Sequence, residues 1–432
     1  MMKKFNTNFT KPSQEKLKSL LKYYQTRQFI AAETLSISIT KEFPEHHFAW
    51  KVLAAVLKQT GKLSESIIPA QKSVQLAPKD PEAHNNLGNI LKVLGKLNEA
   101  EASYRNALAL KSDYAEAYNN LAVTLKRIGK LNEAEVNYHK AIALKSDYAE
   151  AYNNLGNIQH VLGRSNEAEI SYRKAIKIKF DYAEAYKNLG ALLMKFKKSK
   201  GAQRCFEKAL KYHPDHEEAK HLYSALIGKT TNSPPKIYVE NLFDDYAKKF
   251  ENHLVNKLEY KIPKKITEII VGNNPNLQLG SVLDLGCGTG LIGDEIKRYC
   301  SNLEGVDLSF SMLEQARAKN IYNKLIQKDI KDYLSIEVLN FDYFILADVF
   351  IYIGDLYEIF QLIKTRNKSK GKLLFSTEHT DKNNFFLEKS GRYSHSKKYI
   401  ETLCNEFGYN LSYFETTNLR KSNDGFINGG LY

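Results

Sequence analysis

An internal repetition constrains the first half of this chain more than any other feature. The pentapeptide Tyr-Ala-Glu-Ala-Tyr begins at Tyr114, Tyr148 and Tyr182, at intervals of 34 residues. A unit of that length cannot bury its own apolar face, so successive units stack into a solenoid with a shared core. Extending the frame predicts six units, which begin at Ser13, His47, Pro81, Ala115, Ala149 and Ala183.

Residues that recur within the frame predict two helices in each unit. The recurring core residues are Leu53, Leu87, Leu121, Leu155 and Leu189 in the first helix, then Tyr104, Tyr138, Tyr172 and Phe206 in the second. The turns between paired helices are marked by Gly61, Gly95, Gly129 and Gly163. The pattern resembles the tetratricopeptide repeat, which implies an all-α superhelix with a concave face. A last helix near residues 216–226 is expected to close the array.

One polar residue also recurs on the first helices, which line the concave face of such a superhelix. The series consists of Asn86, Asn120, Asn154 and Asn188. A side-chain amide both donates and accepts, so such a ladder can pair with the backbone of an extended peptide. The series resembles the asparagine ladder in the repeat half of O-linked N-acetylglucosamine transferases, which implies a protein or peptide partner. Recent duplication of any polar surface residue would produce the same series.

The second half contains a glycine-rich stretch at residues 282–290, Val-Leu-Asp-Leu-Gly-Cys-Gly-Thr-Gly. Its apolar start predicts a strand buried on both faces, and residues 291–296 predict the helix that follows. Alternating glycines allow a cofactor to approach the backbone closely. The spacing of Gly288, Gly290 and Gly293 also satisfies the dinucleotide pattern GxGxxG, so a nicotinamide cofactor stays an alternative.

Carboxylates follow the next two predicted strands. Asp307 ends the strand of residues 303–306, where it can accept hydrogen bonds from both hydroxyls of a ribose. Asp329 ends a third strand that begins at Leu325. A dinucleotide site leaves Asp329 unexplained, and this favours a different adenosine-bearing cofactor.

These three motifs together resemble the class I S-adenosylmethionine-dependent methyltransferases, over roughly residues 237–432. The resemblance implies an α/β, Rossmann-like domain with a mostly parallel seven-stranded sheet. It implies that the glycine loop holds the methionine end of the cofactor, Asp307 the ribose and Asp329 the adenine amine. The expected cofactor-binding residues are Asp284, Gly286, Cys287, Gly288, Gly290, Asp307, Leu308, Met312, Asp329 and Ile330.

Segments on either side of these motifs suggest a lid and an acceptor site. Residues 238–250 form an amphipathic pattern that resembles the lid helix of many such enzymes, although an aromatic stripe is more often ordinary core. Residues 348–355 and 392–396 resemble bacterial methyltransferases that carry tandem repeats. Asp348 and His395 are the candidates for a general base, although Asp348 could instead bind the ammonium group of the cofactor.

Composition and cysteine spacing limit the partners. The formal net charge is +14, but Lys and Glu alternate along the helices, and residues 347–350 lack the Asn-Pro-Pro-Tyr-like turn of base-modifying enzymes. The sequence therefore does not favour a nucleic-acid partner. The four cysteines form no CxxC pair, so no metal site and no disulfide framework is expected. Without a long apolar run or signal-like start, we expect a cytoplasmic protein with no membrane partner.

The expected organisation is a repeat solenoid at 13–228, a linker at 229–236 and a methyltransferase domain at 237–432. The last strand, at residues 426–432, looks short. The leading hypothesis is methyl transfer to a protein or peptide that the solenoid recruits. The alternatives are a small-molecule methyltransferase whose repeats organise a complex, a non-catalytic scaffold, and a nicotinamide-dependent oxidoreductase.

Overall fold

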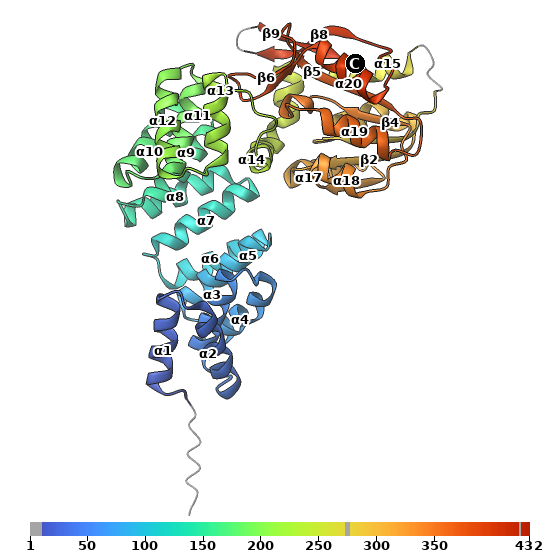
Figure 1. The fold of residues 1–432 in the computed structure, drawn as a ribbon. Helices are drawn as coiled ribbons and strands as arrows, with labels where there is room; N and C mark the ends of the chain where they lie inside the picture. Colours follow the sequence, from blue (N-terminus) through green and yellow to red (C-terminus); the bar gives the residue numbers. More distant parts are fainter. Residues whose placement is uncertain (1–10, 273–276, 423–424) are drawn as a thin grey trace, which may run out of the picture. The chain divides into compact units, whose positions relative to one another are not determined.

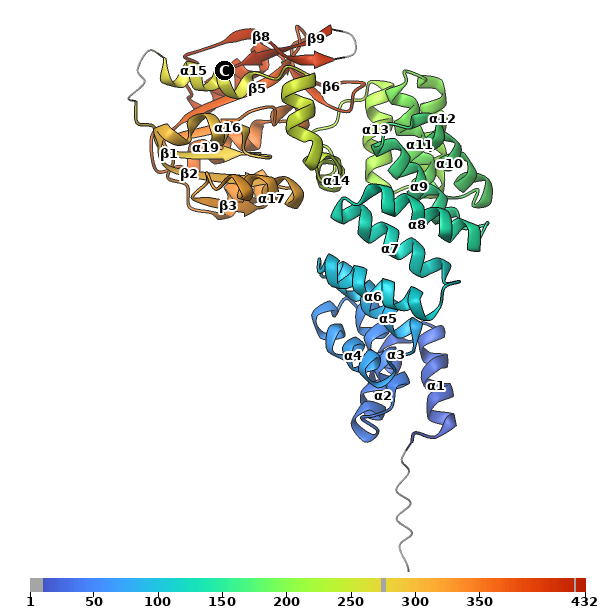
Figure 2. The same ribbon diagram turned by 180° about the vertical axis from the view of Figure 1, so that it is seen from behind.

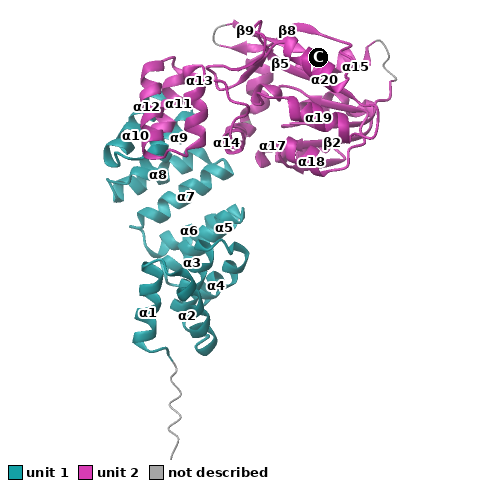
Figure 3. Ribbon diagram, in the orientation of Figure 1, with its two compact units in different colours: residues 1–185 teal, residues 186–432 magenta. Residues whose placement is uncertain are grey.

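The computed structural model describes residues 11–272, 277–422 and 425–432 (Figure 1). The chain forms two compact units, of which the first ends at Ala185 and the second runs from Tyr186 to Tyr432 (Figure 3). The predicted limits of the linker, 229 and 236, both lie within the second unit and stay predictions.

The first unit is built from successive helix pairs, in agreement with the repeat pattern. Its helices are α1 (Gln14–Gln25), α2 (Phe29–Glu42), α3 (His47–Gln59), α4 (Leu63–Leu76), α5 (Pro81–Val93), α6 (Leu97–Leu110), α7 (Ala115–Ile128), α8 (Leu131–Leu144), α9 (Ala149–Val161) and α10 (Ser165–Ile178). Each first helix begins at or one residue after the predicted start of its unit. Gly129 adopts a φ of 88° where α7 turns into α8, a conformation that side chains with a Cβ rarely adopt.

Aromatic residues of the second helices form the core between paired helices. Tyr104 and Tyr172 are buried against Gly88 and Gly156, where an added Cβ would lie 2.7 Å and 2.6 Å from the rings. Each phenol donates a hydrogen bond of 2.8 Å to an asparagine of its own unit, Asn89 or Asn157. The unit of residues 115–148 differs, because alanine and valine stand at the positions of the glycine and the asparagine. Gly190 faces the ring of Phe206 in the same way, with an added Cβ 2.7 Å from the ring, although alanine stands at the asparagine position there.

The second unit begins with the remaining repeat helices and the segment before the sheet. These elements are α11 (Ala183–Lys195), in which the division between the units falls, α12 (Ser199–Tyr212), α13 (Glu217–Ile227), α14 (Lys236–Tyr246), the 3₁₀ turn η1 (Ala247–Lys249), the π-helical turn η2 (Asn252–Lys257) and α15 (Ile262–Val271). The helix predicted at 238–250 thus ends earlier than expected, at Tyr246.

A mixed sheet of nine strands forms the centre of the second unit (Figures 1 and 2). The strands are β1 (Gly280–Leu285), β2 (Cys300–Asp307), β3 (Lys324–Gln327), β4 (Tyr343–Leu346), β5 (Lys372–His379), β6 (Phe385–Leu387), β7 (Tyr393–His395), β8 (Glu415–Ser422) and β9 (Gly425–Leu431). The path β3-β2-β1-β4-β5 is parallel, and β9 then pairs antiparallel with both β5 and β8. This path has the seven strands that were expected, and the short strands β6 and β7 are additional.

Helices cover both faces of the sheet. They are α16 (Leu291–Ile296), α17 (Phe310–Lys319), α18 (Ile330–Ile336), α19 (Tyr357–Arg366) and α20 (Lys397–Phe407). Leu283 and Phe344 pack with residues of α18, α19 and α20, whereas Val282 and Ile345 pack with residues of α15 and α16. Because β1 and β4 are buried on both faces, the strand ends are where a site can form, and in parallel sheets it forms at the carboxyl ends.

Helix length and hydropathy give one further result. Within the described part of the chain, no helix is long and apolar enough to cross a membrane.

Candidate functional site

A cavity of about 590 Å³ opens at the carboxyl ends of β1, β2 and β4. Nine of the ten residues predicted to bind a cofactor line it: Asp284, Gly286, Cys287, Gly288, Asp307, Leu308, Met312, Asp329 and Ile330. The tenth, Gly290, caps the start of α16 with a φ of 89°. The volume of the cavity falls in the range of small-molecule and cofactor sites.

The glycine loop gives this cavity an open floor. Gly286 has a φ of 74°, and an added Cβ would lie 2.4 Å from Val349 Cγ2. At Gly288 an added Cβ would meet nothing within 4 Å, so the backbone there faces open space. The neighbouring hydroxyl of Thr289 is buried and has no hydrogen-bond partner among the described residues. An unpaired buried hydroxyl beside open backbone is suited to a polar ligand.

Two buried carboxylates stand beside the loop. Asp307 accepts hydrogen bonds of 2.8 Å from the backbone N–H groups of Gly288 and Ser309. Asp284 accepts one of 2.6 Å from the phenol of Tyr322, a residue that sequence reasoning missed. Burial raises the pKa of Asp307 to about 6, against the opposing effect of its two N–H partners. Burial, and secondarily repulsion from Asp307, raises the pKa of Asp284 to about 7 although the Tyr322 hydrogen bond lowers it.

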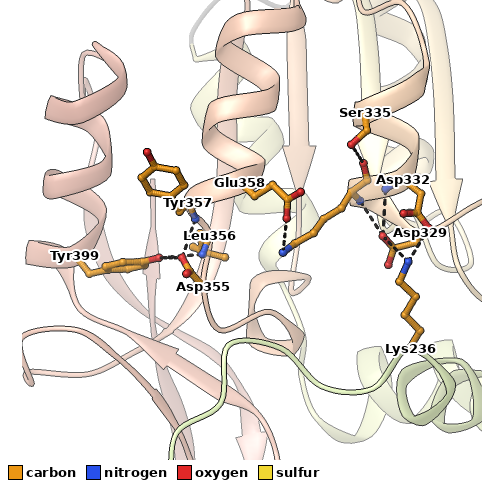
Figure 4. A network of polar contacts seen from close by, with 10 residues as sticks. Lys236, Asp329, Asp332, Ser335, Asp355, Leu356, Tyr357, Glu358 and Tyr399 are labelled. Atoms are coloured by element: carbon orange, nitrogen blue, oxygen red, sulfur yellow. Dashed lines mark hydrogen bonds and ion pairs between the residues drawn. The ribbon is translucent and has the colours of Figure 1, made fainter.

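The third predicted carboxylate, Asp329, caps α18. Its Oδ1 accepts from the N–H groups of Lys331 and Asp332 at 3.1 Å and 3.2 Å. Lys236, the first residue of α14, places its Nζ 3.4 Å from Asp329 Oδ1 and 2.6 Å from Asp332 Oδ2 (Figure 4). No sequence pattern indicated this contact, because it joins residues 93 positions apart that share no motif.

The segment after Lys236 covers the cavity, as the lid pattern predicts. Phe243, Tyr246 and Phe250 line it, with ring centroids 5.4 Å apart for Tyr246 and Phe250 and 6.3 Å for Phe243 and Phe250. A carboxylate oxygen of Asp244 accepts hydrogen bonds from the Ser309 hydroxyl at 2.5 Å and the Ser311 N–H at 3.1 Å. This helix is therefore attached to the start of α17.

Charged side chains gather at another part of the cavity wall. Asp348, with a φ of 55°, accepts a hydrogen bond of 3.0 Å from Ser376 and is paired with Arg420. Arg420 and Arg392 both donate to Glu378 Oε1, at 2.7 Å and 2.6 Å. Burial lowers the pKa of Arg420, but attraction to Asp348 and Glu378 outweighs it and holds that pKa above its ordinary value. Asp348 is thus committed to a cation of the protein itself.

His395 is not brought to the cavity. It is fully buried in β7, its Nε2 lies 2.8 Å from the carbonyl oxygen of Gly354, and it is absent from the residues that line the cavity. Burial lowers its pKa to about 4, so the imidazole is neutral at physiological pH. Of the two candidates for a general base, only Asp348 lies at the cavity.

In the first unit, the predicted ladder interlocks with a second asparagine series. The side-chain amide of Asn120 donates to Asn85 Oδ1 at 3.2 Å, and that of Asn154 donates to Asn119 Oδ1 at 3.4 Å. Asn85 and Asn119 are buried, whereas Asn120 and Asn154 are half-buried. The first ladder residue, Asn86, is half-buried too, and the last, Asn188, belongs to the second unit.

Metal ligands were not expected from the sequence. Over residues 11–272, 277–422 and 425–432, no group of three His, Cys, Asp or Glu side chains is placed to hold a metal ion.

Family models match both parts of the chain. A model described as a methyltransferase domain matches residues 283–375. Models of the tetratricopeptide repeat match residues 70–102, 88–129, 126–163, 149–182 and 183–223. The first match covers the glycine loop and all three carboxylates at the strand ends, and the others cover the helix pairs.

Curated relatives match a limited part of the chain. An uncharacterised protein of Haemophilus influenzae is 32% identical over 114 residues, which are 24% of this chain and 44% of that protein. Ribosomal RNA small subunit methyltransferase C of Aliivibrio fischeri is 29% identical over 115 residues, 24% of this chain and 34% of that enzyme. The chain therefore spans less than half the length of either relative.

Solved structures resemble the helical part. YrrB, titled a TPR protein with an unusual peptide-binding site, is 20% identical over 43% of this chain and 96% of its own, with a TM-score of 0.35. PilW, titled a widely conserved type IV pilus biogenesis factor, is 18% identical over 48% of this chain and 98% of its own, with a TM-score of 0.45.

Proposed function

We propose that this chain, which joins tetratricopeptide repeats to a methyltransferase domain, transfers a methyl group from S-adenosylmethionine to a protein or peptide that its repeats recruit. The observation that carries the proposal is the hydrogen bond between Gly288 and Asp307, which both line the cavity of about 590 Å³. It sets a glycine loop and a ribose-binding type of carboxylate side by side.

The residues at the cavity fit this cofactor. The loop at Gly288 is open to the methionine end, and the unpaired Thr289 hydroxyl would supply a polar contact there. Asp307 would accept from the ribose hydroxyls and Asp329 from the adenine amine. Leu308, Met312 and Ile330 supply apolar walls for the purine. The bound cofactor would supply an electrophilic methyl group on a sulfonium.

The chain contributes mainly alignment and exclusion of water. Methyl transfer is an in-line displacement, which needs the acceptor atom held close to the methyl group along one direction. The aromatic side chains of Phe243, Tyr246 and Phe250 close one side of the cavity. Asp348 is paired with Arg420. This favours a role in positioning neighbouring groups over the role of a general base.

The domain limits at 13–228, 229–236 and 237–432 are part of the proposal. They are supported by the linker's contacts, because the carbonyl oxygen of Asn232 accepts from the N–H groups of Gly354 and Asp355 at 3.1 Å and 2.8 Å. Residue 232 thus lies against the turn that follows β4 instead of continuing the helix pairs.

Recruitment of a polypeptide by the asparagine ladder is supported by its half-buried amides. Asn86, Asn120 and Asn154 stand at one position of three successive helix pairs. A small-molecule acceptor is the second candidate, because the enclosed cavity itself is large enough for a cofactor and a small partner. In that case the repeats only assemble a complex.

Calorimetry and a transfer assay test the proposal. Full-length protein is titrated with S-adenosylmethionine, S-adenosylhomocysteine and NAD, and binding of NAD alone would overturn the cofactor assignment. Labelled methyl transfer into lysate is then sorted into protein, nucleic-acid and metabolite pools. Label in the protein pool supports recruitment, label in the metabolite pool supports the small-molecule candidate, and cofactor binding without any transfer supports a non-catalytic scaffold.

A further inference from the structure

Two arginines converge on one carboxylate oxygen at the cavity wall. Arg392, directly before β7, and Arg420, on β8, both donate to Glu378 Oε1. The other terminal amino group of Arg420 donates to Asp348 Oδ2. Within the described ranges, the guanidinium of Arg392 donates through its Nε alone, and the Arg392 side chain is 27% exposed. Both arginines line the cavity, whereas Glu378 is buried.

Unused hydrogen-bond donors collect at this place. A guanidinium carries five N–H donors, of which Arg392 uses one. Among the residues that the structure describes, its two terminal amino groups have no hydrogen-bond partner, and neither do the phenols of Tyr260 and Tyr352. Both tyrosines line the cavity, where Tyr260 is buried and Tyr352 is half-buried. The electrostatic neighbours of Tyr352 include Arg392, Arg420 and Asp348.

The nearby acceptors are already engaged. Asp348 accepts from Ser376 and Arg420, and Glu378 accepts from both arginines. The formal charges of the two arginines and two carboxylates cancel, so a ligand here is held by directed donors and not by net attraction. Buried donors are costly to leave unpaired, and a planar guanidinium matches a group with two anionic oxygens.

We propose that the acceptor carries an anionic oxygen group, a carboxylate or a phosphate, that Arg392, Tyr260 and Tyr352 bind inside the cavity. The inference rests on the proposed function, since it names the chemistry of the acceptor for the same site. The anionic group anchors the acceptor, and the atom that receives the methyl group is a separate matter. The surrounding rings of Phe243 and Tyr246 make an apolar or aromatic body beside that group favourable.

The cofactor itself has a carboxylate, and this is the competing assignment for Arg392. The two assignments differ in what binds more weakly when the guanidinium is removed. A cofactor contact predicts weaker binding of S-adenosylhomocysteine, and an acceptor contact predicts weaker binding of a separate anion while the cofactor is in place.

Small probes of matched shape separate these cases. Full-length protein saturated with S-adenosylhomocysteine is titrated with benzoate, phenyl phosphate and the neutral amide benzamide. We expect one of the anions to bind at least about tenfold more tightly than benzamide, because hydrogen bonds to charged groups contribute that much. The better of benzoate and phenyl phosphate identifies carboxylate or phosphate chemistry. Arg392→Gln should abolish the preference, and Arg392→Lys should restore only part of it.

The control is Arg173→Gln, which removes an exposed arginine paired with Glu169 in the first unit and should change nothing. If Arg392→Gln does not fold, Tyr352→Phe serves in its place and should lower the anion's affinity by a smaller factor. Equal binding of benzamide and both anions would overturn the inference. So would a tenfold loss of S-adenosylhomocysteine affinity in Arg392→Gln with the anion's affinity unchanged.

Failure of the proposed function gives a different result. If the wild-type protein does not bind S-adenosylhomocysteine, the methyltransferase proposal falls. The same titrations without cofactor then decide the anion site by itself, on the same preference over benzamide.

Discussion

The backbone N–H of Gly288 donates a 2.8 Å hydrogen bond to Asp307 Oδ2. The loop after β1 and the end of β2 are therefore fixed to each other. A ligand that contacts the loop also meets the carboxylate, whose other oxygen is held by Ser309. These hydrogen bonds limit the movement of the loop and of the carboxylate relative to each other, and such rigidity lowers the cost of ordering a binding site.

The charge of Asp307 should control cofactor affinity. Burial raises the pKa of Asp307 to about 6, so its carboxylate is mostly protonated at pH 5 and mostly ionised at pH 7. Only the ionised form accepts from both ribose hydroxyls, so affinity for S-adenosylhomocysteine should rise between these pH values. Asp307→Asn should weaken binding at pH 7 by roughly 10-fold to 100-fold and flatten the pH dependence. Calorimetry at several pH values measures both.

The matched control is Asp381→Asn, because Asp381 is a fully exposed carboxylate outside the cavity. Its pH dependence should equal that of the wild type. Wild-type affinity that stays constant from pH 5 to pH 7 would contradict the ribose assignment.

Asp284 should make the unliganded protein less stable as pH rises. Burial raises its pKa from 3.8 to about 7, so between these pH values the folded state binds more protons than the unfolded state. The free energy of unfolding then falls with pH, by up to about 1.4 kcal/mol per pH unit. Below pH 3.8 the contribution is fully present, and above pH 7 it is lost.

Asp284→Asn removes this titrating group while keeping an acceptor for the phenol of Tyr322. Urea unfolding at pH 4.5, 5.5, 6.5 and 7.5 should therefore give a stability difference between variant and wild type that grows with pH in favour of the variant. A constant difference across the series would show that Asp284 does not titrate in this window.

The elements that the sequence predicted are those with a local periodic or spacing signal. The helix pairs followed from residues that recur every 34 positions, and β1 to β3 followed from apolar runs that end in glycine or aspartate. The hairpin of β6 and β7 has three residues in each strand, too few for an alternation to be recognised. Its sequence therefore looks like a loop.

Contacts across the fold were not predictable in the same way. Arg420 meets Asp348 from 72 positions away, and only the pairing of β9 with both β5 and β8 brings β8 to the cavity. A single arginine in a strand carries no sign of that role. The buried series Asn85 and Asn119 repeats with the same interval as the ladder, so periodicity alone could not show which series faces outward.

The glycine beside Tyr172 should be coupled to the asparagine that holds the ring. An added Cβ at Gly156 would lie 2.6 Å from the ring, and the ring cannot shift while its phenol is bonded to Asn157. Gly156→Ala should therefore destabilise the first unit by overpacking, by about 1 kcal/mol after the gain in helix propensity. Adding Asn157→Val reproduces the pair found at Ala122 and Val123 and should recover at least about 0.5 kcal/mol.

Urea unfolding of the wild type, both single variants and the double variant gives the coupling free energy directly. Additive effects of the two substitutions would show that ring position and the asparagine hydrogen bond are independent.

Asn86 provides the cleanest test of polypeptide recruitment. Asn120 donates to Asn85, so its removal also costs stability, whereas Asn86 has no hydrogen-bond partner among the residues described. Asn86→Ala should leave stability and S-adenosylhomocysteine affinity unchanged.

If the ladder holds the acceptor's backbone, the Asn86→Ala variant should raise the acceptor concentration needed for half-maximal methyl incorporation by roughly 5-fold to 10-fold, the contribution of one hydrogen bond. The maximal rate should stay the same, because the lost contact lies outside the cavity. Asn106→Ala, an exposed asparagine on α6, is the control and should behave as wild type. Equal incorporation by both variants would favour the small-molecule acceptor, for which the repeats serve only assembly.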